Sequence, residues 1–176
     1  MPKLSLEQLK EKLRKIKLLA LDVDGVLTDD SLFFGPDGFE LKRFNISDGL
    51  YIVLAMRSGL EIAIVSGRYS PATDTRMKDL GVKHILQGMK DKVEMITPLV
   101  KELDLTFDDI AFVGNEILDI KLAKLASVGI AVADSSPDML DAADFVTEKN
   151  GGEGAVREVI EYYFEANNID PKEFLI

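Results

Sequence analysis

The chain has 176 residues, with 21 basic and 31 acidic side chains, so its formal net charge at neutral pH is −10. This length suits one domain, and a hydrophobic fraction of 47% is ordinary for a folded protein and too high for a disordered acidic one. The negative balance disfavours general binding to nucleic acids or anionic membranes, because both ligands reward clustered lysine and arginine side chains. The absence of cysteine excludes disulfides, thiolate metal sites and cysteine nucleophiles, and it is compatible with a reducing cytoplasm.

The first 17 residues carry charges throughout and lack a long apolar stretch, so we do not interpret them as an export signal. Ser5 is a suitable N-cap, and the leucines that follow it repeat at helical spacing. This pattern predicts a short amphipathic helix that leads into the core. No window of the sequence approaches the roughly 20 apolar residues of a membrane-spanning helix.

Short apolar runs then alternate with amphipathic stretches along the chain. The runs are rich in β-forming residues and do not alternate with polar ones, which is typical of strands buried on both faces of a parallel sheet. The predicted strands cover residues 17–21, 61–65, 110–113 and 129–132. The predicted helices cover residues 49–58, 73–80, 92–103, 117–124, 137–142 and 154–167. This alternation predicts right-handed crossovers and a three-layer α/β sandwich.

One segment, at about residues 30–45, interrupts the alternation of strands and helices. Two β-rich runs flank a Gly-Pro-Asp-Gly turn at 35–38, which predicts a β-hairpin inserted after the first strand. The hairpin carries more large apolar side chains than a solvated hairpin needs. They either pack on the same domain or form a subunit interface, and we favour the interface because exposed apolar patches mark contacts.

Two aspartates, Asp22 and Asp24, directly follow the first predicted strand. They therefore lie at the carboxyl end of a strand, where open α/β sheets place their functional sites. Acidic side chains this close repel each other unless a cation or a proton lies between them. Gly25 permits a sharp turn out of the strand. The segment is either a solvated aspartate-rich turn or part of a site that holds a cation.

Further polar residues follow the later strands. Ser66 comes after the strand at 61–65, and its hydroxyl either binds a phosphate oxygen or caps the next helix. Lys90 and Lys92 lie at the start of the following helix, where one of them can supply a fixed positive charge beside a phosphate. The alternative for each lysine is an exposed side chain with no role. His84 is interpreted as structural.

The order of these groups along the chain resembles the four motifs of the haloacid dehalogenase superfamily. Asp22-Val23-Asp24-Gly25 resembles the first motif, and Ser66 stands at the place of the second. A lysine stands at the place of the third motif, and the segment after the strand at 110–113 resembles the fourth. The resemblance implies that Asp22 is a nucleophile for phosphoryl groups and that Asp24 is the general acid and base. It also implies that Lys92, rather than Lys90, is the catalytic lysine.

The same resemblance implies a Mg²⁺ site. Its ligands would be the Asp22 carboxylate, the Asp24 backbone carbonyl and a residue of the fourth motif, for which the candidates are Asn115, Glu116 and Asp119. An all-oxygen site suits Mg²⁺. A zinc site is not expected, because the chain has one histidine and no cysteine.

From about residue 17 to 164 the chain is similar to the cap-less family of 3-deoxy-D-manno-octulosonate 8-phosphate (KDO 8-phosphate) phosphatases. The resemblance rests on Asp-Val-Asp-Gly-Val-Leu-Thr-Asp at 22–29, Phe-Asn-Ile-Ser-Asp-Gly at 44–49 and the glycine-rich segment at 151–158. It implies one phosphatase domain over 1–176 without a cap domain. It also implies a homotetramer built through the hairpins, and a C-terminal segment at about 150–168 that reaches the mouth of the active site. The family context is lipopolysaccharide precursor synthesis in the cytoplasm.

The expected substrate is therefore a phosphorylated acidic sugar. Arg68 and Arg76 are candidates for its carboxylate, because arginine binds carboxylates with two parallel donors. Arg68 is favoured because it follows Ser66 and Gly67 directly. The family resemblance adds Gly67 and Asn45 as substrate contacts, and Arg157 is a weaker candidate.

The fourth motif departs from the family pattern, since Asn115 and Glu116 stand where two aspartates are usual. An amide oxygen still coordinates a metal but brings no charge, so we expect either that metal affinity falls or that Glu116 or Asp119 compensates. The same residues resemble relatives that act on nine-carbon keto sugar acids. Two alternatives therefore remain: a phosphatase of a sialic-acid-like 9-phosphate, and a weakly active structural homologue.

Overall fold

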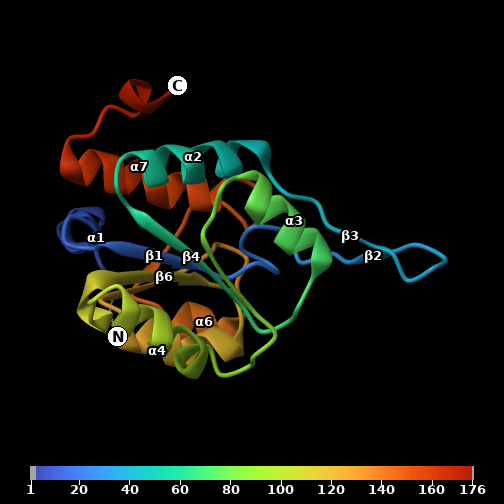
Figure 1. The fold of residues 1–176 in the computed structure, drawn as a ribbon. Coiled ribbons are helices and arrows are strands. Elements are labelled where there is room, and N and C mark those ends of the chain that lie inside the picture. The colour runs from blue at the N-terminus through green and yellow to red at the C-terminus, as the bar shows by residue number, and fades with distance from the viewer. Residues whose placement is uncertain (1–2, 176) are drawn as a thin grey trace.

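The computed structural model describes residues 3–175, in which a six-stranded parallel sheet forms the central layer (Figure 1). Its strand order is β5-β4-β1-β6-β7-β8. In chain order the strands are β1 (Leu18–Leu21), β4 (Glu61–Ser66), β5 (His84–Gln87), β6 (Ile110–Gly114), β7 (Val128–Ala131) and β8 (Phe145–Val146). The four strands predicted from the sequence are confirmed within one residue at each end. The edge strands β5 and β8 were not predicted, because both are only partly buried and lack a long apolar run.

Helices cover both faces of this sheet (Figure 1). They are α1 (Leu6–Leu13), α2 (Ile46–Arg57), α3 (Pro71–Asp79), α4 (Lys92–Glu102), α5 (Ile120–Leu125), α6 (Pro137–Ala142) and α7 (Ala155–Asn167). The predicted helices are confirmed with shifted ends. Helix α2 begins three residues early because Asn45 caps it. The predicted helix at 117–124 is divided into a 3₁₀ turn at Ile117–Asp119 and helix α5.

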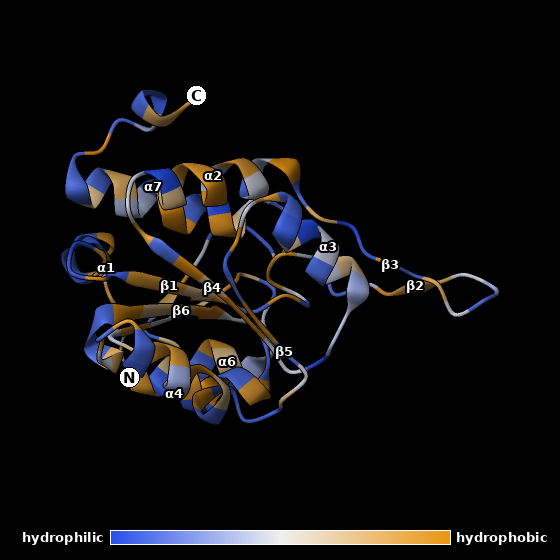
Figure 2. Ribbon diagram, in the orientation of Figure 1, coloured by the Kyte–Doolittle hydropathy of each residue, from blue (hydrophilic) through white to orange (hydrophobic). Residues whose placement is uncertain are grey.

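Two hydrophobic cores lie on opposite faces of the sheet. Side chains alternate between the two faces, so Leu19 and Leu21 of β1 pack with α1, α2 and α7, whereas Leu18 and Ala20 pack with α4, α5 and α6. Figure 2 shows hydrophobic residues along the central strands, and both hydrophobic and hydrophilic residues on the helices around them. The three-layer α/β sandwich predicted from the sequence is confirmed. No helix within residues 3–175 is long and apolar enough to cross a lipid bilayer.

The hairpin consists of β2 (Phe33–Phe34) and β3 (Glu40–Leu41), which pair antiparallel. It is shorter than predicted and projects from the end of the sheet at which the parallel strands finish (Figure 1). Gly38 in its turn has a φ of +74°, a conformation that glycine adopts without strain. Between β1 and α2 the described chain contains this hairpin and its connecting loops, and no cap domain.

Candidate active site

The floor of the site is formed where β1, β4 and β6 finish. Leu21 pairs with Ile64 of β4 and with Val113 of β6, so the residues that follow these strands meet at one edge. Asp22 extends β1 by one further hydrogen bond, from its backbone N–H to the carbonyl of Val113 at 3.0 Å. Its carboxylate is therefore held at the centre of the sheet edge, where it is 6% exposed.

A buried lysine joins two carboxylates on this floor. Lys92 Nζ lies 2.6 Å from Asp22 Oδ1 and also forms an ion pair with Asp119. Asp91 caps α4 and so fixes Lys92 as the first residue of that helix. Burial alone would lower the pKa of Lys92, but the two carboxylates outweigh it and raise the pKa above its ordinary value. Burial, and then the charge of Asp119, raise the pKa of Asp22 to about 7 against the opposing influence of Lys92.

Asp119 also shapes the loop after β6. Its Oδ2 accepts hydrogen bonds from the backbone N–H groups of Asn115 at 2.8 Å and Glu116 at 3.0 Å. The Glu116 side chain accepts from the N–H of Ile117 at 3.0 Å. Both acidic side chains of the fourth motif thus bond backbone N–H groups of the loop, whereas Asn115 lines the cavity close to Gly25.

Asn115 is 6% exposed, and its Oδ1 is a buried atom with no hydrogen-bond partner. It packs tightly on the loop after Asp24. A Cβ on Gly25 would lie 1.9 Å from Asn115 Nδ2, and Gly25 has a φ of +77°. Glycine is therefore required at this position both for the turn and for the close approach of the amide.

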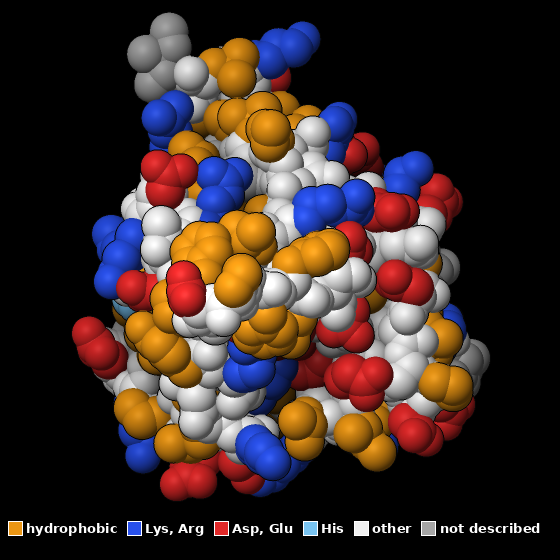
Figure 3. All heavy atoms as spheres, turned by 90° about the vertical axis from the view of Figure 1, so that its right-hand side faces the viewer, with side chains coloured by type: hydrophobic (Ala, Val, Ile, Leu, Met, Phe, Trp, Pro, Cys, Tyr) orange, Lys and Arg blue, Asp and Glu red, His pale blue; other side chains and the backbone are white. Residues whose placement is uncertain are grey.

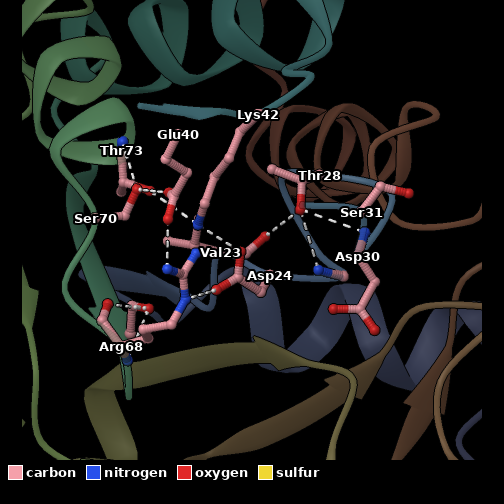
Figure 4. Close-up of polar contacts among 12 residues, drawn as sticks. Val23, Asp24, Thr28, Asp30, Ser31, Glu40, Lys42, Arg68, Ser70 and Thr73 are labelled. Carbon is pink, nitrogen blue, oxygen red and sulfur yellow. Dashed lines mark hydrogen bonds and ion pairs between the residues drawn. The ribbon is translucent and has the colours of Figure 1, made fainter. Parts of the chain in front are cut away.

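Asp24 lies between Arg68 and Lys42, the residue that follows the hairpin strand β3 (Figure 4). Lys42 Nζ contacts Asp24 Oδ1 at 2.5 Å, and Arg68 Nε lies 3.6 Å from Asp24 Oδ2. Arg68 also forms an ion pair with Glu40 at 2.5 Å, and its Nη2 is buried without a partner. The hydrogen bond from Arg68 lowers the pKa of Glu40.

A cavity of about 350 Å³ opens above this floor. Figure 3 faces this end of the molecule and shows charged side chains of both signs beside a hollow, next to a cluster of hydrophobic side chains. Most of the predicted site residues line the cavity, together with Asp30, Lys90 and Leu118. The predicted residues among its lining are Asp22, Asp24, Ser66, Gly67, Arg68, Lys92, Asn115, Glu116 and Asp119.

Asn45 and Arg76 do not line this cavity. Asn45 Oδ1 accepts from the N–H groups at the start of α2, and its Nδ2 donates to Gly152 O at 3.3 Å. Arg76 bonds Asp79 at 3.1 Å and lines a separate groove between α3 and the hairpin. In the single subunit both residues therefore lie outside the cavity, and their assignment to substrate binding stays a prediction. The weaker candidate Arg157 is also outside, stacked 4.8 Å above the ring of Tyr51.

The glycine-rich segment packs against the backbone of the loop that follows Asp24. Gly152 N–H donates to Val26 O at 2.9 Å, and a Cβ on Gly151 would lie 1.8 Å from Gly25 O. Only glycine at 151 allows the two backbones to approach this closely. The segment supports the loop that follows Asp24, and in the single subunit it does not line the cavity mouth.

Sequence reasoning missed Glu40 and Lys42, which contact Arg68 and Asp24. The available signal is two charged residues at alternate positions with an apolar residue, Leu41, between them. Side chains at alternate positions of an extended chain point to the same side, so Glu40 in β3 and Lys42 directly after it both turn towards the domain.

The donor set at the floor suits a hard divalent cation. Asp22 contributes a carboxylate whose pKa is raised, and a neighbouring cation would favour its charged form. Asn115 contributes a buried amide oxygen that lacks a partner. Within residues 3–175 no three acidic or histidine side chains converge as a ready metal cluster, so these two oxygens would need backbone and ligand oxygens to complete the shell.

A parallel α/β sheet with a buried aspartate, a second aspartate two residues later and a salt-bridged lysine at its carboxyl edge defines a haloacid dehalogenase-like hydrolase. The model of that hydrolase family matches residues 81–160. A relative in Escherichia coli (strain K12), "3-deoxy-D-manno-octulosonate 8-phosphate phosphatase KdsC", is 40% identical over 148 residues, which are 84% of this chain and 79% of the relative. The chain belongs to the family of KDO 8-phosphate phosphatases.

Solved structures agree with this relationship. The KDO 8-phosphate phosphatase of Moraxella catarrhalis, described in complex with a magnesium ion, a phosphate ion and a KDO molecule, is 37% identical with a TM-score of 0.90. The match covers 93% of this chain and 94% of that one. The enzyme of Yersinia pestis is 34% identical with a TM-score of 0.89, and the match covers 91% and 86% of the two chains.

Proposed function

We propose that the chain is a Mg²⁺-dependent phosphomonoesterase that hydrolyses KDO 8-phosphate to KDO and phosphate. The observation that carries this proposal is the buried Asp22 carboxylate, bonded to Lys92 and facing the cavity at the carboxyl edge of the sheet. A carboxylate in this place is positioned to attack a phosphorus atom bound above it, and the membership of the chain in a phosphatase family supports that chemistry.

The proposed reaction has two phosphoryl transfers. In the first, an Asp22 oxygen forms a bond to phosphorus while the bond from phosphorus to the sugar oxygen breaks, and Asp24 donates a proton to that oxygen. In the second, Asp24 accepts a proton from water as the water oxygen attacks phosphorus, and the aspartyl-phosphate bond breaks. Mg²⁺, when bound beside Asp22 and Asn115, supplies positive charge that neutralises the phosphate oxygens.

The remaining residues bind and orient the substrate. The Ser66 hydroxyl and the Lys92 ammonium border the cavity, where they would stabilise the charge that develops on a bound phosphate. Arg68 has one donor nitrogen, Nη2, that is buried and has no protein partner, which suits it to the carboxylate of an acidic sugar. This local positive charge lets an acidic protein hold a small anion.

Steady-state phosphate release from KDO 8-phosphate, measured with Mg²⁺ and with a chelator, tests the proposal. Asp22→Asn is expected to abolish turnover, whereas Asp108→Asn, an exposed change at the opposite end of β6, is the matched control. Turnover that persists in Asp22→Asn, or that ignores Mg²⁺, would contradict the proposed mechanism.

Asn115 and Glu116 favour a second candidate, in which the substrate is a nine-carbon keto sugar acid 9-phosphate. Relative kcat/KM values for eight- and nine-carbon substrates decide between the two. A third possibility is a structural homologue with little activity. A kcat/KM above about 10⁴ M⁻¹s⁻¹ on either substrate would exclude it.

We also propose that four copies of the chain assemble through their hairpins, in the cytoplasm. Apolar side chains on the hairpin are exposed, with Phe34 and Phe39 each 65% exposed, which is unusual for a surface that stays in water. Light scattering after size exclusion should show a tetramer for the unaltered chain and smaller species for Phe34→Ser. A monomeric unaltered chain would refute the assembly without affecting the reaction.

A further inference from the structure

Lys42 is the only hairpin residue among the described ones whose ammonium reaches the carboxylate of Asp24 (Figure 4). The Lys42 side chain has no exposed surface, although the preceding residue, Leu41 of β3, is exposed. Apart from Asp24, it bonds the hydroxyl of Thr73, at 3.3 Å. A buried ammonium group is costly without such partners, so the fold around β3 places the charge beside this carboxylate.

This contact distinguishes the two oxygens of Asp24. An ammonium group only donates hydrogen bonds, so Oδ1, at 2.5 Å from Lys42, must accept one. The other oxygen, Oδ2, lies 3.6 Å from Arg68 Nε, beyond hydrogen-bond distance. Oδ1 is therefore held by the ammonium group, and Lys42 fixes the direction in which Oδ2 points.

We propose that Lys42 is a positioning residue that holds Asp24 in the orientation needed for proton transfer, so that the hairpin controls the acid and base step. This inference rests on the proposed function, because it assumes that Asp24 exchanges a proton with the leaving oxygen and with water. Glu40 belongs to the same network. Its carboxylate accepts hydrogen bonds from Arg68 and from the hydroxyl of Ser70, each at 2.5 Å, and so links the hairpin to the start of helix α3.

The competing explanation is that Lys42 only anchors the hairpin to the domain. The neighbouring Arg43 is a suitable comparison, because it is 57% exposed and ties the hairpin to Asp29 at 3.1 Å without contact to Asp24. Removal of an anchor would disturb both phosphoryl transfers and all substrates alike. Removal of a positioning residue for proton transfer would affect those reactions that need the proton.

The experiment compares esters whose leaving groups differ in their need for a proton. Lys42→Met keeps the apolar stem and removes the charge, Lys42→Arg restores it, and Arg43→Met is the control. The rate of leaving-group release in the first turnover is measured by rapid mixing with KDO 8-phosphate, an alkyl ester, and with 2,4-dinitrophenyl phosphate.

For Lys42→Met we expect an approximately 100-fold loss with the alkyl ester and less than about a three-fold loss with the dinitrophenyl ester, which leaves without a proton. Lys42→Arg should recover at least about ten-fold of the loss, and Lys42→Met should add no loss in an Asp24→Asn background. Equal losses with both esters, or an added loss in that background, would overturn the proposal.

A crystal structure of Lys42→Met provides a readout that does not depend on turnover. The Asp24 carboxylate should rotate away from its position in the unaltered chain, while Asp22 and Lys92 remain in place. An unmoved Asp24 would overturn the proposal. Failure of the unaltered chain to hydrolyse either ester would instead refute the proposed function, and this crystallographic comparison would still decide the role of Lys42. Light scattering on the same samples shows whether assembly is preserved.

Discussion

The cavity has a floor and a hairpin side that are built in different ways. On the floor, Asp22, Lys92 and Asp119 are nearly or fully buried and come from strand ends and a capped helix. On the hairpin side, Asp24 and Arg68 remain partly exposed and depend on contacts to two-residue strands. Changes to residues of the floor should therefore lower both activity and the free energy of unfolding, whereas changes on the hairpin side should affect the hydrophobic core less.

The strongest way to break this comparison is to remove the lysine from the floor. Lys92→Met leaves two buried carboxylates without their cation, so we expect the free energy of unfolding to fall by about 3–5 kcal/mol. Phosphate release should fall by about a factor of 10³ or more. Chemical denaturation and steady-state assays measure both. Lys101→Met, an exposed change on the same helix, is the control, and an unchanged unfolding free energy for Lys92→Met would contradict the comparison.

The next largest effect concerns the pH dependence of the metal-free chain. The pKa of Asp22 is raised from 3.8 to about 7, so between these values the folded chain binds more protons than the unfolded chain. The contribution of the Asp22 carboxyl to the free energy of unfolding is therefore largest at low pH. It is lost as the pH rises through about 7, by roughly 2–4 kcal/mol.

Denaturation curves across this pH range, with a chelator present, should decline less steeply for Asp22→Asn than for the unaltered chain. Added Mg²⁺ should restore most stability at the upper end of the range, where Asp22 is charged. Parallel curves for the two chains would show that Asp22 does not titrate in this window.

A smaller effect is expected at the Asn115 amide. Asn115→Asp adds a charge beside Asp22, which should lower the Kd for Mg²⁺ about ten-fold and destabilise the metal-free chain. Calorimetric titration with Mg²⁺ measures the first effect and thermal unfolding in chelator the second. Asn168→Asp, on the exposed surface after α7, is the control. Weaker Mg²⁺ binding in Asn115→Asp would show that Asn115 is not a ligand.

The smallest effect on stability is expected on the hairpin side. Glu40→Gln removes the charge that pairs with Arg68 but keeps a hydrogen-bonding side chain. Because Arg68 is 39% exposed, we expect the free energy of unfolding to change by less than about 1 kcal/mol. Urea denaturation measures this change. A loss as large as that of Lys92→Met would remove the distinction between the two sides of the cavity.

The predictable and unpredictable parts of the site follow the same division. Asp22, Ser66 and Asn115 were predicted to meet because each follows a buried strand, and the ends of parallel strands meet at one edge. The choice of Lys92 over Lys90 came from family resemblance, and the structure gives its physical basis in the Asp91 cap and the burial of Lys92.

The hairpin contacts could not be predicted from local patterns. Lys42 reaches Asp24 across 18 positions and Glu40 reaches Arg68 across 28, and no periodicity encodes such contacts. Asn45, predicted as a substrate contact, lies outside the cavity of the single subunit. Its side chain caps helix α2, which begins three residues before the predicted start.

The place of β1 in the sheet has a consequence for how the chain is made. The strand that precedes Asp22 is synthesised before both of its neighbours, β4 and β6, which come from residues 61–66 and 110–114. One edge of this apolar strand lacks its partner until residue 114 has left the ribosome, and Lys92 lacks Asp119 until residue 119 has done so. Until then the nascent chain carries an apolar strand that is paired on at most one side, and the site is completed only by pairing of segments distant in the sequence.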